Sequence, residues 1–122
     1  SAASDVYRRR ANGVAPSYAQ NHFPAEEKRG NLRLVVSPDG AEGSVGMHQD
    51  ARLYAGLFDG DESAELALGA GRLGYVHVAR GRVVVNGRTL AAGDALLYRD
   101  ESVVSIAQGH DAEVLVFDLP PM

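Results

Sequence analysis

The chain of 122 residues contains no cysteine, and this absence removes several kinds of chemistry. Thiol nucleophiles, disulfides and zinc–thiolate sites are excluded, so the stability must come from packing. A reducing compartment is compatible with this composition, and we expect the protein to be cytoplasmic. The sequence also lacks any apolar run of about 18 residues, so it predicts no membrane-spanning helix and no membrane partner.

Positive charge is outnumbered by negative charge, because 12 lysine and arginine residues stand against 16 aspartate and glutamate residues and give a formal net charge of −4. No basic field exists to attract nucleic acid, so we expect no nucleic-acid partner. The run Arg8–Arg10 is a local exception that a solvated segment explains. Nucleophilic catalysis has no support either, since there is no G-x-S-x-G and no grouping of serine, histidine and aspartate.

Residues 1–31 differ from the rest of the chain in having no sustained periodicity. We interpret them as an extended N-terminal arm or linker, with a short helical turn near "PAEEK" (24–28). Tyr18 and Phe23 are expected to anchor this arm by packing. The chain begins with Ser1 and lacks the apolar core of a signal peptide, so we expect a processed, tagged or excised chain.

From Leu32 onward the pattern is all-β, and residues 32–122 are predicted to form one domain. Short runs rich in Val, Leu, Ile and Tyr alternate with turn residues, including Asp59-Gly60 and Gly93-Asp94. Asn86-Gly87 is the strongest hairpin signal, because both central positions of its turn need positive φ. The predicted strands are "LRLVV", "SVGMH", "RLYAGLF", "SAELAL", "YVHVA", "RVVV", "RTL", "ALLY", "SVVSI" and "EVLVFDL". The acidic residues between 59 and 65 are interpreted as a solvated loop.

This pattern resembles the cupin fold, a double-stranded β-helix or jelly-roll barrel. Its metal-binding members carry G-x5-H-x-H-x3,4-E-x6-G followed by G-x5-P-x-G-x2-H-x3-N. Imidazoles and one carboxylate then hold Fe, Mn, Ni or Cu with positions left open. Gly81 fits the closing glycine of the first motif, and Gly93 fits the opening glycine of the second.

When the cupin motif is aligned on Gly81 and Gly93, no ligand position carries a side chain that could bind a metal ion. The glutamate position holds Gly74, and the histidine position of the second motif holds Val104. The two histidine positions of the first motif fall at Leu68 and Ala70, or at Ala67 and Gly69. We therefore expect a metal-free barrel with no catalytic residue and no cofactor.

Strand alternation predicts an aliphatic interior, because side chains two residues apart share a face. Such an interior is filled by its own side chains or holds one small apolar ligand. Leu66 and Ser102 are expected on the same inner side. The residues of this candidate pocket are Leu68, Val76, Val78, Val104 and Ile106.

The four histidines show no metal-ligand spacing. His77 has opposite parity to Gly74, so it should face away from the interior. His22 falls in the arm and His110 in the predicted "QGHDAE" turn. The remaining one, His48, stands with Asp50 and Arg52 at a strand junction, and these three form a candidate polar site.

Four further motifs occur in order along the chain: "GVAPSYAQ" (13–20), "SPDG" (37–40), "HQDARLY" (48–54) and "VLVFDLPP" (114–121). Together they resemble the C-terminal cupin of pirin-like bicupins, some of which are described as quercetin dioxygenases. The resemblance implies a two-domain parent whose N-terminal cupin binds Fe or another divalent transition metal through three histidines and a glutamate. The C-terminal cupin usually lacks ligands, as this chain does.

The sequence and the family resemblance are compatible with three functions. The first is a non-catalytic, metal-free domain with a structural, partner-contact or small-ligand-binding role. The second is a metal-dependent quercetin 2,3-dioxygenase whose ligands come from His48, from His77, or from an N-terminal cupin or partner chain. The third is a sensor of a small apolar molecule. Because a lone barrel leaves its packing face bare, we also expect a homodimer or a missing N-terminal cupin to cover it.

Overall fold

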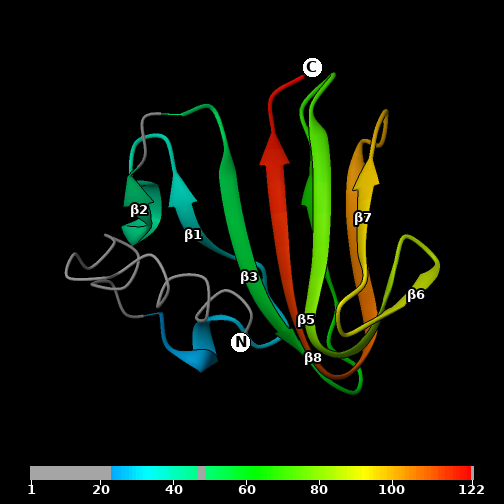
Figure 1. The fold of residues 1–122 in the computed structure, drawn as a ribbon. Coiled ribbons are helices and arrows are strands. Elements are labelled where there is room, and N and C mark those ends of the chain that lie inside the picture. The colour runs from blue at the N-terminus through cyan, green and yellow to red at the C-terminus, as the bar shows by residue number, and fades with distance from the viewer. Residues whose placement is uncertain (1–22, 47–48, 122) are drawn as a thin grey trace.

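The computed structural model describes residues 23–46 and 49–121, which form an all-β domain (Figure 1). Two single-turn 3-10 helices accompany the strands. In chain order the elements are η1 (Ala25–Glu27), β1 (Arg33–Ser37), η2 (Ala41–Gly43), β2 (Val45–Gly46), β3 (Arg52–Phe58), β4 (Ala64–Ala67), β5 (Leu73–Val85), β6 (Arg88–Ala91), β7 (Ala95–Tyr98) and β8 (Val103–Leu119).

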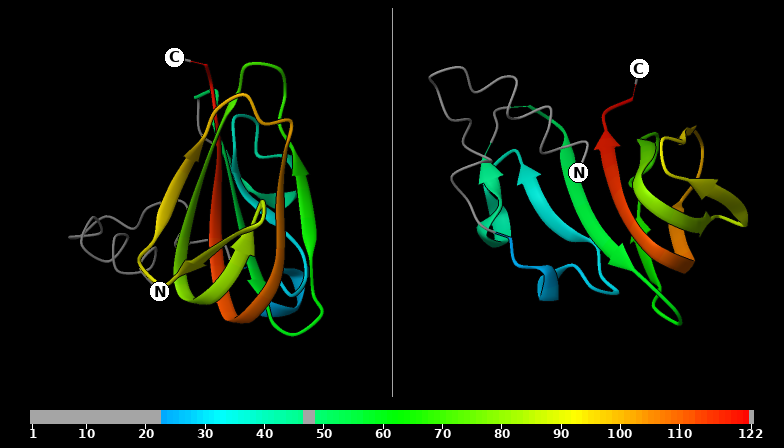
Figure 2. Two further views of the ribbon diagram at one scale, coloured as in Figure 1. Left: turned by 90° about the vertical axis from the view of Figure 1, so that its right-hand side faces the viewer. Right: turned by 60° about the horizontal axis from the view of Figure 1, so that its bottom comes forward.

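The strands belong to one mixed sheet that curls round on itself (Figure 2). Its hydrogen-bonded order is β2-β1-β3-β8-β5-β6, while β4 pairs with β8 and β7 pairs with β5. β1 and β2 run parallel, and the other pairs are antiparallel. The all-β barrel predicted from the sequence is therefore confirmed.

Two long, bent strands hold the barrel together, and here the sequence prediction is wrong in detail. "YVHVA" and "RVVV" are one continuous strand, β5, and "SVVSI" and "EVLVFDL" are one strand, β8. The predicted turn around His110 is a bend inside β8, where Gln108 and Asp111 have φ of 52° and 47°. The first part of β8 pairs with β4 and the last part with β3, so β8 joins two walls of the barrel.

The bends depend on a close approach between β5 and β8. Their register shifts three times between Val78 and Val84, which marks β-bulges. Gly81 lies at this point with φ 74°, and a Cβ added there would overlap the carbonyl oxygens of His110 and Asp111. A glycine is therefore needed for steric reasons where the backbones of the two paired strands come closest at the bulges.

The hairpin predicted at Asn86-Gly87 is confirmed. Both residues have positive φ, 49° and 80°, and Val85 pairs with Arg88 across the turn. The Asn86 side chain has a second role, because its Oδ1 accepts a hydrogen bond from Ser105 N at 2.7 Å. Its Nδ2 donates to the carbonyl oxygen of Val103 at 3.2 Å, so the turn is fastened to the start of β8.

The described part of the predicted arm, residues 23–31, is in contact with the sheet. Ala25–Glu27 form the short helical turn expected near "PAEEK". Leu57 N donates to Lys28 O, and Gly30 N donates to Leu57 O, both at 2.7 Å, so residues 28–30 lie against β3. Phe23 is buried, as the anchoring prediction required, whereas Tyr18 and His22 lie outside the described residues.

Buried apolar side chains form two clusters on opposite faces of the sheet. The inner cluster fills the barrel and includes Phe58, Val76, Val104 and Val116. The outer cluster joins Phe23, Val35 and Val45 to the outward side chains of Ala55 and Leu115. Within the described residues, no helix is long and apolar enough to span a membrane.

Candidate functional site

The five residues of the predicted small-ligand pocket all lie in the inner cluster. Leu68 is 7% exposed, and Val76, Val78, Val104 and Ile106 are fully buried. Leu66 packs against the same cluster, but Ser102 is exposed because β8 begins only at Val103. Entry of a small apolar molecule among these side chains stays a prediction.

The positions where the cupin motif carries its metal ligands meet inside the barrel. A Cβ built on Gly74 would lie 3.0 Å from Leu68 Cδ1 and 3.3 Å from Val104 Cγ2. Ala70, the remaining position, is exposed in the turn before β5. The three inner positions therefore meet in space, where the chain presents the methyl groups of Leu68 and Val104 and a glycine instead of imidazoles and a carboxylate.

These residues do not fit a metal ion. Aliphatic side chains offer no lone pairs, and a divalent cation transferred from water to such surroundings loses its hydration without compensation. Among the described residues, no group of three or more histidine, aspartate and glutamate side chains could hold a metal ion. No chemical step can be assigned to a metal bound by these residues.

A largely buried ion pair lies next to Gly74, which stands at the glutamate position of the cupin motif. Asp118 is the cross-strand partner of Gly74 and has the parity of Val114 and Val116, whose side chains fill the interior. Arg72 Nε donates to Asp118 Oδ1 at 2.7 Å, and both side chains are largely buried. This hydrogen bond raises the pKa of Arg72 above its usual value, so the guanidinium is a permanent cation beside the carboxylate.

Arg72 also forms hydrogen bonds with Asp50, two residues before β3 begins. Its Nη1 donates to Asp50 Oδ2 at 2.8 Å, and its Nη2 donates to the carbonyl oxygens of Asp50 and Asp118 at 3.1 and 3.2 Å. The predicted polar site is thus only partly assembled. Asp50 joins this network, Arg52 is the cross-strand partner of Asp118, and His48 lies outside the described residues.

Sequence reasoning missed Arg72 and Asp118, which stand 46 residues apart. One signal was present: Asp118 is an acidic residue in the apolar strand "VLVFDL", and a buried carboxylate requires a partner. The identity of that partner was not readable, because the pairing of strands far apart in the sequence decides which side chains meet.

Tyr54 shares the interior with this ion pair. Burial raises the pKa of Tyr54 above its usual value of 10.0, and the negative charge of Asp118 raises it further. Its folded-state pKa therefore exceeds the unfolded one, so the associated stability is complete below about pH 10 and is lost as the pH rises through the folded-state pKa.

The upward shift of the Tyr54 pKa on folding gives a prediction for Tyr54→Phe. The variant should lose less stability than the parent chain as the pH rises above about 10, because it has no hydroxyl that ionises more readily when unfolded. Urea unfolding midpoints across this range measure the difference. An equally steep decline in both proteins would contradict the predicted effect of burial on Tyr54.

The acidic turn forms the rim of a polar pocket of about 380 Å³, and its carboxylates fasten backbone instead of forming an acid–base pair. Asp59 Oδ1 accepts from Asp111 N at 3.0 Å, and Glu62 Oε1 accepts from Asp59 N at 2.8 Å. The solvated-loop interpretation agrees with the exposure of Asp59, Asp61 and Glu65, whereas Glu62 is half-buried. The pocket is lined by Arg29, Leu57, Phe58, Asp59, Glu62, Arg80, Asp111 and Ala112.

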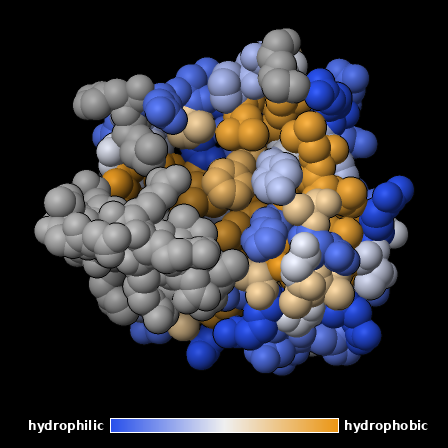
Figure 3. Space-filling view, in the orientation of Figure 1, coloured by the Kyte–Doolittle hydropathy of each residue, from blue (hydrophilic) through white to orange (hydrophobic). Residues whose placement is uncertain are grey.

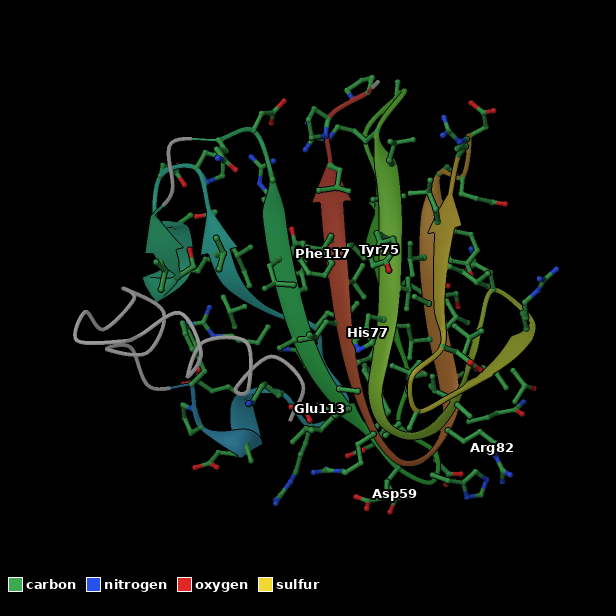
Figure 4. All side chains as sticks on the ribbon, in the orientation of Figure 1. Asp59, Tyr75, His77, Arg82, Glu113 and Phe117 are labelled. Carbon is green, nitrogen blue, oxygen red and sulfur yellow. The ribbon has the colours of Figure 1, made fainter. Side chains whose placement is uncertain are left out.

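His77 lies on the outer face of β5, between the inward-facing Val76 and Val78, as its parity predicted (Figure 4). Its cross-strand partners are Leu115 and Ala95. His110 is exposed at the bend of β8. Neither histidine reaches the Leu68–Gly74–Val104 position from within the chain.

The curled sheet with its inward aliphatic stripe defines the class of this protein as a single cupin barrel. Residues 34–119 match the family described as the quercetinase C-terminal cupin domain. The chain belongs to this family, the C-terminal cupins of pirin-like proteins.

Relatives and solved structures agree with this assignment. The chain is 39% identical to a quercetin 2,3-dioxygenase of Escherichia coli K12 over 111 residues, which cover 91% of the chain and 47% of that protein. It is 34% identical to a pirin-like protein of Caulobacter vibrioides, over 87% of the chain and 46% of the relative. The crystal structure of YhhW from E. coli superposes with a TM-score of 0.77 and 37% identity, covering 84% of this chain and 42% of that one.

The same fold occurs in a structure of bacterial pirin YhhW from E. coli in complex with nickel(II). It has a TM-score of 0.71 and 39% identity, covering 75% of this chain and 40% of that one. The chain described here spans less than half the length of the curated relatives it matches.

Proposed function

We propose that this chain is a metal-free cupin domain of the cytoplasm that performs no catalysis and acts in structure and partner contact. The supporting observation is the convergence of Leu68, Gly74 and Val104 at the place where metal-binding cupins carry their ligands. Arg72 beside Asp118 also supports it, because the carboxylate of the residue paired with Gly74 across the strands is already neutralised by a fixed cation.

Metal analysis tests this proposal. We expect the untagged chain, incubated with excess Ni(II) or Fe(II) and desalted, to retain far less than one equivalent of Fe, Mn, Ni or Cu by plasma mass spectrometry. The physical reason is that the converging side chains supply no donor atoms. The E. coli pirin that is described with nickel(II), treated in parallel, serves as the positive control. Near-stoichiometric metal in this chain would overturn the proposal.

An enzymatic role is the second candidate, and the names of the relatives favour it. They include quercetin 2,3-dioxygenase, and the matched region is less than half of that protein. In such a parent, the metal and the chemistry would belong to a metal-bearing N-terminal cupin or a partner chain. This chain would then support the catalytic half, and its removal would weaken stability or assembly instead of abolishing the reaction outright.

Binding of a small apolar ligand is the third candidate. The ligand would enter among Leu68, Val76, Val78, Val104 and Ile106. Since these side chains are almost fully buried within one cluster, a ligand would have to displace packed side chains. We therefore place this role after partner contact.

A further inference from the structure

A row of large apolar side chains crosses the outer face of the sheet. Leu53, Phe117, Tyr75 and Leu97 come from β3, β8, β5 and β7, and each is the cross-strand partner of the next. Tyr75 and Leu97 are 37% and 43% exposed, and they are the exposed large hydrophobic residues of the described chain. Figure 3 shows the apolar patch on this face, and Figure 4 shows Phe117 and Tyr75 side by side.

The row is continuous with a groove beside it. The rings of Tyr75 and Phe117 meet edge to face with centroids 5.8 Å apart. On the other side of Phe117, a groove of about 260 Å³ extends the apolar surface toward Val36. The groove is lined by Val36, Gln49, Ala51, Arg52, Leu53, Phe117 and Leu119.

We propose that this row binds the same row of a second copy of the chain, so that two sheets stack face to face around a two-fold axis. The axis would run parallel to the strands, between β8 and β5. This operation places β8 over β5 of the second copy and β3 over β7. Phe117 then faces Tyr75 of the second copy, and Leu53 faces Leu97. A surface that pairs with itself must match in this way.

The charged residues at one end of the row are also placed in complementary pairs by the proposed two-fold axis. Glu113 on β8 and Arg80 on β5 are cross-strand partners, so they lie at the same height on the sheet. The two-fold axis sets Glu113 of each copy over Arg80 of the other. Arg80 is free to exchange its present partner, because its contact with Asp111 is long, 3.4 Å, and exposed. Two complementary pairs would thus fix the register of the dimer.

This inference rests on the partner-contact role proposed above and names the partner. Its tests measure association and not metal content, so either proposal can fail without the other. In sedimentation and light scattering over a range of concentrations, we expect a dimer of the 12.9 kDa chain that dissociates on dilution. A monomer at all concentrations would overturn the inference and assign the face to another domain.

Single substitutions locate the interface. Tyr75→Glu should weaken dimerisation at least about tenfold, because it would bury a carboxylate in the apolar row. The matched control is Ala67→Glu, which adds the same charge at an exposed position of β4 and should leave the dissociation constant unchanged. If Tyr75→Glu does not fold, Leu97→Ala gives the same information without a new charge. Equal effects at positions 67 and 75 would contradict the proposed surface.

A charge swap tests the axis. Glu113→Arg alone and Arg80→Glu alone should each weaken the dimer, because each places like charges over one another. The double variant restores opposite charges and should recover most of the lost affinity. A double variant as weak as the singles would exclude this two-fold arrangement.

Discussion

Gly81→Ala is expected to destabilise the domain by about 3–4 kcal/mol, because it combines left-handed strain with a steric overlap. The residue has φ 74°, and the added methyl group would overlap the backbone carbonyl oxygens of His110 and Asp111. These are backbone atoms of β8 and cannot rotate away. Urea unfolding measures the change, which corresponds to a melting temperature lower by roughly 12–16 °C.

Gly87→Ala is the matched control. Gly87 has nearly the same backbone conformation, φ 80°, but a Cβ added there meets no atom within 4 Å. It therefore adds only the conformational strain of about 1 kcal/mol. A similar loss in both variants would mean that the close approach of β5 and β8 contributes little.

The comparison of Gly81 with Gly87 also tests whether a glycine of the cupin motif is needed for the backbone structure or for metal binding. Gly81 occupies the closing glycine of the metal-binding cupin pattern, although the ligand positions of that pattern hold Leu68, Gly74 and Val104. The glycine is required by the close approach of the β5 and β8 backbones at their bulges, and that requirement does not depend on a metal. The glycine of the motif is thus a structural requirement, and only the residues at the ligand positions could bind a metal ion.

Arg72→Met is the second large effect, with an expected destabilisation of about 3 kcal/mol. The substitution keeps an apolar stem but leaves the Asp118 carboxylate without its cation, and that residue is only 7% exposed. It also releases Asp50, which precedes β3. Denaturant unfolding at neutral pH measures the loss.

Two controls interpret this result. Asp118→Asn in the Arg72→Met background should recover part of the stability, because an amide has no charge to leave uncompensated. Arg80→Ala removes an exposed, long ion pair and, measured at a concentration at which the chain is monomeric, should change stability by less than about 0.5 kcal/mol. A loss as small for Arg72 as for Arg80 would show that Asp118 is solvated by other means.

The alternation of side chains along each strand produces both the apolar row on the outer face and the aliphatic ligand positions inside the barrel. Along β5, Tyr75 and His77 face outward, while Val76 and Val78 face the interior. Successive strands add their own outward residues to the same row through their register. A strand pattern thus prepares two apolar surfaces at once, one filled by its own side chains and one open on the outside (Figure 3).

The sequence by itself determined the strand-rich class, the Asn86-Gly87 hairpin and the inward set of Val76, Val78 and Val104. It also determined that Leu68, Gly74 and Val104 stand at the aligned cupin ligand positions, because that depends only on residue types. These features follow from local periodicity and turn chemistry, which act over a few residues.

Only the tertiary structure decided the rest. It merged four predicted strands into β5 and β8, since a positive φ at Gly81 or Gln108 is compatible with a turn and with a bulge alike. It joined Arg72 to Asp118, and it aligned Leu53, Phe117, Tyr75 and Leu97 in one row. Cross-strand register between distant segments makes these contacts, and register is set by the packing of the whole sheet.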